Sequence, residues 1–354
     1  MDILIKTTLG MEKVAATRVE ETIPEVQVIP KPYGFMGLVA VKTELDKKEA
    51  AKKIESNVLE ADRVIVVEEC VPANLDEIAE AAARIAKKSI GSKDTFAVRT
   101  VRRGKHEFTS IDVNVVAGAA VKKATRALVD LKYPSKIIRI EILKNLALIA
   151  IEDGEKELKK IRPGKIPVIE FLRKIAIIQM PYLGPLNAIR AIGVRVGREV
   201  QTFEVRELVI SPIGAVKAEE LKVFIEGVFE GINSRYEIQR KTYGRKVWRV
   251  PVFIQDLHQL VRERRRREPI IVLEPEGEPL PKVKDNLAEI LLSEKKRINV
   301  LIGAREGIPL GIYRFANLVV DICPGITIST DYAAASALIA FSTIIEEKLL
   351  EKKS

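Results

Sequence analysis

The chain is 354 residues long and carries a net charge of +10, with 31% charged and 5% aromatic residues. A chain of this length can hold two or three domains with separate cores, and its positive charge favours an anionic partner, nucleic acid first. Two cysteines exclude a disulfide framework and a cysteine-rich metal site, and two histidines disfavour a histidine-based metal site. No apolar run reaches the ~20 residues of a membrane span. No signal peptide is recognised, so we expect a cytoplasmic protein.

Residues 1–70 predict a small α+β module. Apolar residues alternate in three segments, which predicts strands at 3–9, 37–43 and 63–71. A helical spacing of apolar residues predicts helices from residue 10 to about 21 and at 45–56. No combination of residues typical of catalysis occurs in this module.

Residues 71–165 predict a second module, built around a basic turn. A helix is expected at 74–89 with a capping box from Asn74 and Glu77, and a hairpin is expected from strands at 136–143 and 146–153. Between them, DTFAVRTVRRGKHEF begins as an alternating strand, and Ser110 is expected to cap the helix that follows. The charged, proline-containing stretch 154–167 is expected to be a linker.

The basic turn of this module is a candidate site for nucleic acid. Cationic side chains surround Gly104, and a helix N-terminus with free N–H groups follows, a combination that suits phosphate. Phe108 is expected to anchor the core or, alternatively, to stack on a base. The candidates for RNA binding are Arg99, Arg102, Arg103, Lys105, His106 and Phe108.

Residues 170–354 alternate between strands and helices. Fully apolar strands between helices predict an α/β domain whose mainly parallel sheet is covered on both faces. The predicted strands are 174–180, 204–211, 247–255, 269–275, 297–303 and 318–322. The predicted helices are 187–198, 216–232, 255–267, 282–293 and a final helix from about Asp331.

The helix predicted at 255–267 ends in five arginines, Arg262 and residues 264–267. Arginines in a last turn suit the helix dipole. Four in a row exceed what the dipole requires, so we favour a surface that follows RNA phosphates. Its candidate residues are Arg264, Arg265 and Arg266.

Three predicted strands of this domain open into loops, in the segments IVLEPEGEPL, VLIGAREGIP and DICPGITISTDYAAASALI. Ligands of open α/β sheets bind at the carboxyl ends of the strands, so we expect a small-molecule site there, with ordinary turns as the alternative. No GxGxxG motif follows the first strand and no GxxxxGK[ST] motif occurs, which disfavours a dinucleotide site and a P-loop.

These segments carry two family resemblances. The pattern FAVR, RGKHEF, DV and GAAV resembles the THUMP signature, and residues 1–70 resemble the ferredoxin-like module that often precedes THUMP. The three loops, in their order, resemble the cofactor loops of the knotted SPOUT RNA methyltransferases. Three domains are therefore expected: a ferredoxin-like domain at 1–70, THUMP at 71–165 and SPOUT at 170–354. The resemblance is to archaeal-type THUMP–SPOUT tRNA methyltransferases.

The resemblance implies a cofactor, partners and a topology. It implies S-adenosylmethionine as the cofactor, tRNA gripped by THUMP at its 3′ end and acceptor stem, a trefoil knot, and a homodimer formed through the SPOUT domain. The loop residues implied in cofactor binding are Leu273, Glu274, Pro275, Gly277, Ile302, Gly303, Arg305, Gly307, Ile322, Cys323, Gly325 and Ile326.

The same resemblance implies two possible acceptors. For a ribose 2′-hydroxyl, Asn187 and Arg190 would act from the first helix, with Arg195 and Arg198 as alternatives to Arg190, and Glu306 and Ser329 would act from the loops. For a base nitrogen of tRNA or rRNA, Asp331 would be the base. Ribose methylation in or near the acceptor stem leads, because a THUMP grip on the 3′ end restricts reach. A tRNA-binding protein without catalysis is the third interpretation.

Overall fold

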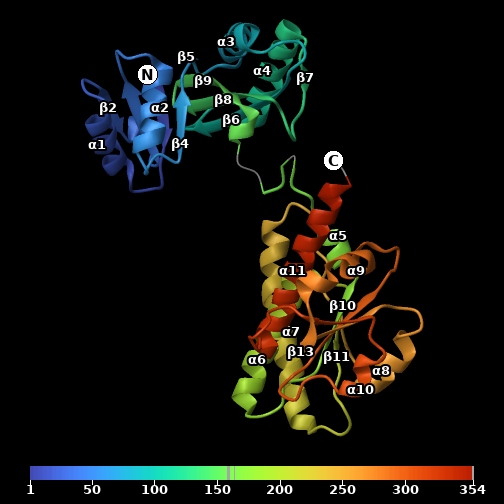
Figure 1. Cartoon of the computed structure of the whole chain (residues 1–354). Helices are drawn as coiled ribbons and strands as arrows, with labels where there is room; N and C mark the ends of the chain where they lie inside the picture. Colours follow the sequence, from blue (N-terminus) through green and yellow to red (C-terminus); the bar gives the residue numbers. More distant parts are fainter. Residues whose placement is uncertain (158–159, 163, 353–354) are drawn as a thin grey trace. The chain divides into compact units, whose positions relative to one another are not determined.

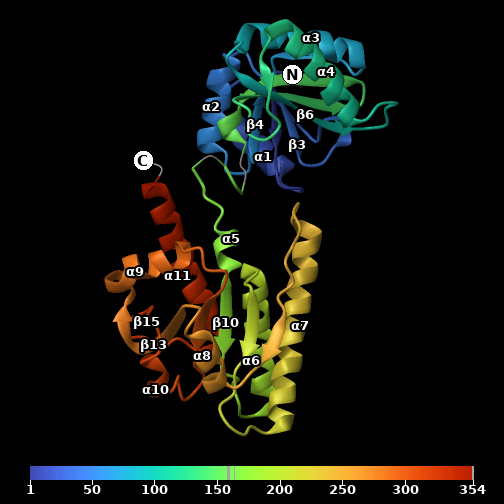
Figure 2. The same ribbon diagram turned by 90° about the vertical axis from the view of Figure 1, so that its right-hand side faces the viewer.

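The computed structural model describes residues 1–157, 160–162 and 164–352. It divides into two compact units, residues 1–163 and 164–354, which are described separately (Figures 1 and 2). The first unit contains two sheets and the second contains one. The linker predicted at 154–167 includes positions 158, 159 and 163, which lie outside the described residues.

The first sheet of unit 1 has the strand order β2-β3-β1-β4 and is antiparallel throughout. Apolar residues of its strands and of two helices form one core, which confirms the alternating pattern. The elements are β1 (Ile3–Lys6), α1 (Glu12–Thr22), β2 (Gln27–Pro30), η1 (Pro32–Gly34), β3 (Leu38–Lys42), α2 (Lys47–Asn57) and β4 (Arg63–Val66).

The second sheet of unit 1 has the order β5-β9-β8-β6-β7, with β6 and β8 parallel at its centre. The strand predicted at 63–71 is therefore two strands, because β4 and β5 pair in different sheets. The hairpin predicted at 136–143 and 146–153 is confirmed. The elements are β5 (Glu69–Pro72), α3 (Leu75–Ser89), β6 (Thr95–Arg103), α4 (Ser110–Thr125), β7 (Leu128–Val129), β8 (Lys136–Leu143), β9 (Leu146–Asp153) and η2 (Gly154–Lys156).

The helix caps of this part differ in two places from the prediction. Asn74 caps α3 as predicted, and its side chain accepts a hydrogen bond from the Glu77 N–H at 2.8 Å. The expected capping box does not form, because the Asn74 N–H donates to the Pro72 carbonyl instead of the Glu77 side chain. Ser110 does not cap α4. Thr109 does, because Asp112 lies three residues further on and completes a capping box: its carboxylate accepts from the Thr109 N–H at 2.7 Å.

Unit 2 is built on one six-stranded sheet of order β12-β11-β10-β14-β13-β15, and every strand pair in it is parallel. This confirms the predicted α/β class. The elements are α5 (Ile169–Leu172), β10 (Ile175–Gln179), α6 (Leu186–Phe203), β11 (Glu207–Ile210), α7 (Ala218–Thr242), β12 (Val252–Ile254), α8 (Leu257–Arg264), β13 (Ile270–Pro279), α9 (Leu280–Leu292), β14 (Ile298–Ile302), α10 (Leu310–Tyr313), β15 (Leu318–Asp321) and α11 (Thr330–Glu351).

Both faces of this sheet are covered, as its fully apolar strands require. The core on one face is shared with α6, α7, α9 and α11, and the core on the other face with α8 and α10. Because every strand runs the same way, the loops that follow β13, β14 and β15 emerge at one edge. We call this side of the sheet, where the carboxyl ends of the strands lie, the carboxyl edge. The opposite side, where the strands begin, is the amino edge.

The helices α6 and α7 pack with their backbones in contact. A Cβ atom on Gly197 would lie 2.1 Å from the Val228 carbonyl oxygen, and one on Gly231 would lie 2.1 Å from the Val194 carbonyl oxygen. Further along, the buried Gln201 donates to Gln239 Oε1 at 3.0 Å. These glycines and glutamines interrupt the apolar periodicity, which explains why both helices extend beyond the predicted ranges 187–198 and 216–232.

The strand predicted at 204–211 begins later because Glu204 ends α6. Its backbone is left-handed (φ 50°), and its buried carboxylate accepts hydrogen bonds from Arg173, Arg245 and the Trp248 N–H. A charged residue at full burial requires such partners. The extended segment predicted at 247–255 forms a strand only at β12, and the helix predicted from 255 begins after the N-cap Asp256.

We expect Gly197→Ala to destabilise unit 2 by roughly 1–3 kcal/mol, because α6 and α7 must separate to admit the methyl group. The matched control is Gly118→Ala in α4, where the added Cβ would lie 3.8 Å from Val98 Cγ2 and make ordinary contact. Calorimetric unfolding of the full chain measures both changes. Unfolding of Gly197→Ala at the wild-type temperature would contradict the close packing.

Candidate active site

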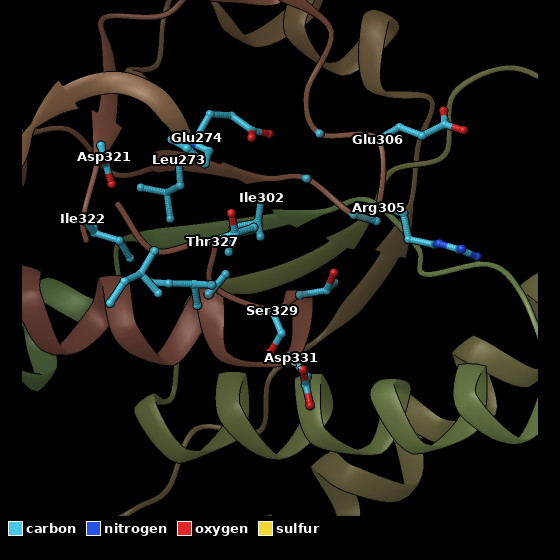
Figure 3. Close-up of a pocket in the computed structure, with 18 of the residues that line it drawn as sticks. Leu273, Glu274, Ile302, Arg305, Glu306, Asp321, Ile322, Thr327, Ser329 and Asp331 are labelled. Atoms are coloured by element: carbon cyan, nitrogen blue, oxygen red, sulfur yellow. Dashed lines mark hydrogen bonds between the residues drawn. The ribbon is translucent and has the colours of Figure 1, made fainter. Parts of the chain in front are cut away.

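A pocket of about 490 Å³ lies at the carboxyl edge of unit 2 (Figure 3). Its wall consists of the segments 273–276, 302–307, 320–322 and 326–331, together with Tyr182, Ile192 and Ala333. The first three segments follow or overlap the ends of β13, β14 and β15, which are neighbours in the sheet. The predicted position of a small-molecule site thus coincides with a pocket in the size range of ligand sites.

A bulge in β13 shapes one wall of this pocket. Leu273 pairs with Val320 of β15, and after a register shift Glu278 pairs with the same residue, so residues 274–277 leave the ladder. A Cβ on Gly277 would lie 2.6 Å from the Val320 backbone nitrogen, so this return to the sheet requires glycine. The strand predicted at 269–275 consequently resumes beyond the bulge and ends at Pro279.

The side chain of Glu274 holds the second loop against the first. Its Oε1 accepts a hydrogen bond from the Ile308 N–H at 2.5 Å. A Cβ on Gly303 would lie 2.6 Å from the same oxygen and 2.8 Å from the Gly307 Cα, so the loop after β14 is folded tightly around this carboxylate. Burial raises the pKa of Glu274.

Most residues predicted for the cofactor line this pocket. The structure places nine of them in its wall: Leu273, Glu274, Pro275, Ile302, Gly303, Arg305, Gly307, Ile322 and Ile326. Gly277, Cys323 and Gly325 are not among the described lining residues, and Gly277 serves the bulge instead. Sequence reasoning missed ten of the lining residues, among them Tyr182, Ile192, Glu276 and Asp321. The last two stand within a quoted motif, whereas the first two carry no signal of their own.

The pocket is acidic although the chain is basic. Five carboxylates line it, and Arg305 is the one basic side chain among its described lining residues. Figure 3 shows Arg305 and Glu306 projecting from their loop away from Leu273 and Ile322. The five are Glu274, Glu276, Glu306, Asp321 and Asp331. Such a wall favours a ligand with positive charge.

An ion pair stands at the start of α11. The nearly fully buried Asp331 accepts a hydrogen bond from Arg195 of α6 at 2.6 Å and another from the Ser329 hydroxyl at 2.8 Å. Burial raises the pKa of Asp331, but these two hydrogen bonds outweigh it and hold the pKa below its usual range. Asp331 is therefore ionised at neutral pH and fixes Arg195 beside Ser329.

The arginine predicted first, Arg190, is placed elsewhere. It pairs with Glu230 at 2.7 Å and with Glu226 at 3.9 Å on α7, and its side chain is 54% exposed. Asn187 is exposed, and neither residue is among the described lining residues. Ser329, Asp331 and Glu306 line the pocket, whereas Arg195, Asn187 and Arg190 are not among its described lining residues. Arg195, although 59% exposed, differs from Arg190 because it is bound to the lining residue Asp331.

Comparison with known proteins assigns the family. A family described as "AF2226-like SPOUT RNA Methylase fused to THUMP" matches residues 169–354, and the THUMP domain matches residues 72–152. The chain belongs to this family. The THUMP and SPOUT resemblances are thereby confirmed, and the protein is an RNA methylase; the domain limits at 70, 165 and 170 stay predictions.

Three relatives match all or part of this chain. An uncharacterized protein of Methanocaldococcus jannaschii is 40% identical over 100% of this chain and 97% of its own length. From the same organism, a "Probable tRNA sulfurtransferase" is 37% identical over 33% of this chain and 32% of its own. Its "tRNA (guanine(6)-N2)-methyltransferase" is 27% identical over 43% of this chain and 41% of its own. In the described part of the chain, no helix is long and apolar enough to cross a membrane, and no cluster of metal-ligating side chains occurs.

In the THUMP domain, several predicted RNA-binding residues are tied into the fold. Arg103 pairs with the buried Glu141 at 2.8 Å, and Arg99 with Glu157 at 3.3 Å. Phe108 packs against the domain core, as the core-anchor interpretation predicted. His106 bonds the Lys144 carbonyl at 2.6 Å, and Arg102 lies 3.2 Å from its other ring nitrogen.

Lys105 therefore differs from its neighbours. It is exposed next to the left-handed Gly104 (φ 118°), at the tip of the basic turn. Because the chain turns at Gly104, Lys105 lies outside strand β6, which contains Arg99, Arg102 and Arg103. Lys105 is the residue of this turn best placed for a phosphate.

In the SPOUT domain, the prediction for Arg264 is wrong. Its side chain is 13% exposed, and its guanidinium donates at 2.8 Å both to Glu207 and to the Asn299 side chain. Since two strand residues at the amino edge bind it, Arg264 anchors α8 to the sheet. Arg265 and Arg266 are exposed, and Arg265 lies 4.3 Å from the centre of the Phe315 ring.

We expect Glu199 of α6 to make the stability of the folded chain depend on pH. Burial, followed by the charge of Asp331, raises its pKa to about 8. Between pH 4.5, the ordinary pKa of a glutamate, and about pH 8, Glu199 is ionised in the unfolded chain but keeps its proton in the folded chain. The free energy of unfolding therefore falls as the pH rises through that range. We expect Glu199→Gln to gain thermal stability over the wild type between pH 5 and 8.

Calorimetric midpoints across that pH range provide the measurement. Glu219→Gln, at an exposed position in the first turn of α7, controls for the loss of one carboxylate. A constant difference between Glu199→Gln and wild type from pH 5 to 8 would contradict the assigned shift.

Proposed function

We propose that this RNA methylase transfers the methyl group of S-adenosylmethionine to a ribose 2′-hydroxyl in or near the acceptor stem of tRNA. The observation that carries the proposal is the acidic pocket at the carboxyl edge, which adjoins the Arg195–Asp331–Ser329 cluster. A donor site and a polar group able to handle an acceptor proton thus share one edge of the sheet.

The pocket residues fit S-adenosylmethionine. Its sulfonium and ammonium groups are cationic, and five carboxylates line the pocket. The loops 273–276 and 302–307 offer backbone N–H and C=O groups, and the glycines of the second loop permit close approach to an adenosine. When bound, the cofactor supplies an activated methyl group, so the protein contributes proximity and orientation.

Arg195 is the residue that we assign to the acceptor of the methyl group. A ribose 2′-hydroxyl is a poor nucleophile that must lose its proton as it attacks. The resemblance places a catalytic arginine on the first helix of the SPOUT fold. On the corresponding helix α6, Arg195 is held by its hydrogen bond to Asp331 of α11. Arg195 therefore takes the role predicted for Arg190 and orients the acceptor; an arginine is ordinarily protonated, so it acts by charge and hydrogen bonding.

The THUMP domain supplies the hold on tRNA in this proposal. Exposed Lys105 stands in the basic turn, and two relatives that match 33% and 43% of the chain are named as tRNA-modifying enzymes. The proposal includes the trefoil knot and a homodimer through the SPOUT domain. Large apolar side chains exposed on its helices support the dimer: Leu186 of α6, and Tyr332 and Ile339 of α11.

Product analysis tests the proposed function. The full chain is incubated with S-adenosylmethionine labelled in its methyl group and with unmodified tRNA, and the RNA is then digested to nucleosides. Label in a 2′-O-methylnucleoside is the expected result. Label on a base would replace the ribose acceptor by a base nitrogen, with Asp331 as the residue to examine. No label in any RNA would contradict the proposal.

Arg195→Ala separates the two candidate arginines. We expect it to lower kcat by about 10²-fold or more, the range of a lost transition-state contact, with little change in S-adenosylmethionine affinity. Arg190→Ala is the matched control on the same helix and removes only pairs to Glu226 and Glu230. Single-turnover methylation of tRNA measures both. Loss of activity in Arg190→Ala alone would restore the first assignment.

A further inference from the structure

The amino edge of the SPOUT sheet carries a second cluster of cations. We infer that this cluster, the amino-edge patch, binds the phosphate backbone of the RNA substrate at a distance from the methylated nucleotide. The patch consists of Arg265, Arg266, Arg267, Lys295 and Lys296. The inference rests on the proposed function and adds a binding surface to it.

Three separate chain segments converge at this patch. Arg264, at the end of α8, is bound to Glu207 at the start of β11 and to Asn299 near the start of β14. The Lys295 ammonium donates to the Arg267 carbonyl at 3.5 Å, and Arg206 donates to the Lys296 carbonyl at 3.1 Å. The patch is therefore a built surface of folded segments and not a single charged tail.

The two acids beneath the patch, Glu207 and Glu268, are already paired with arginines. Glu207 pairs with Arg264 at 2.8 Å and with Arg297 at 3.5 Å, and Glu268 pairs with Arg297 at 3.2 Å. The five patch cations are exposed, and none has a carboxylate within 4.0 Å among the described residues. A stabilising ion-pair network would pair these charges with acids, so the patch presents unbalanced positive charge to solvent.

The patch also exceeds what a helix dipole explains. A dipole stabilises cations within the last turn of its own helix, but Lys295 and Lys296 follow α9 whereas the arginines follow α8. The guanidinium carbon of Arg265 lies 4.3 Å from the centre of the Phe315 ring. The planar fork of a guanidinium loses little side-chain freedom for each hydrogen bond that it forms with a phosphate. Five such charges on an open surface suit a polyanion rather than a single phosphate.

The patch and the pocket lie at opposite ends of the same strands. β14 runs from Ile298 at the amino edge to Ile302 at the pocket, about 13 Å at the ~3.3 Å rise per strand residue. RNA that contacts both surfaces must therefore extend several nucleotides away from its acceptor. β10, the first strand of the SPOUT sheet in chain order, also begins at this edge, after α5 (Figure 2).

Salt dependence of tRNA binding tests the inference. The triple variant Arg266→Ala, Arg267→Ala, Lys296→Ala spares Arg264 and Arg265, which make packing contacts. Each lost phosphate contact reduces the slope of log K against log salt by roughly 0.7–0.9, so the slope should fall by about 2 to 3 and affinity at 0.1 M salt by about tenfold or more. S-adenosylmethionine affinity should stay at its wild-type value.

The matched control removes three exposed lysines of the first unit, Lys13→Ala, Lys42→Ala and Lys52→Ala, and is expected to keep the wild-type slope. An equal loss in this control, or a wild-type slope in the patch variant, overturns the inference. If Lys105→Ala weakens tRNA binding while the patch variant does not, the inference alone fails. If the wild-type protein binds no tRNA, the proposed function is contradicted together with the inference.

Discussion

The SPOUT site depends on the hydrogen bond from the Ile308 N–H to the Glu274 carboxylate. The bulge in β13 releases Glu274 from the sheet ladder, and glycine at 303 and 307 lets the neighbouring loop close around it. Two strand ends that would otherwise carry independent turns are thus fixed to each other. Both loops contribute backbone to the pocket wall, so the shape of the pocket follows from this one contact.

Charge is divided between the two edges of the SPOUT sheet. Carboxylates gather around the pocket at the carboxyl edge, and exposed arginines and lysines gather at the amino edge. The net charge of +10 is therefore distributed unevenly over the surface. The acidic edge suits a cationic methyl donor, and the basic edge suits the RNA that receives the methyl group. Beside the acidic pocket, Arg195 of α6 pairs with Asp331 of α11.

Local patterns predicted the fold and the pocket well. The hairpin at 136–153, the parallel sheet and the loops around Glu274 and Gly303 all follow from alternation, apolar runs and glycine placement. What failed depends on contacts between distant residues. Arg195 and Asp331 are 136 positions apart, so no spacing rule separates Arg195 from Arg190. Arg264 looked like its exposed neighbours because its partners lie on other strands.

Binding of labelled S-adenosylmethionine to the full chain tests the central claim most directly. Equilibrium binding is compared between wild type and Gly303→Ala, in which the new Cβ would stand 2.8 Å from the Gly307 Cα and force the loops apart. The account predicts one site per chain in the wild type and a loss of about tenfold or more in affinity, or ~1.4 kcal/mol, in the variant. Equal affinity in both proteins, or no binding by the wild type, would contradict it.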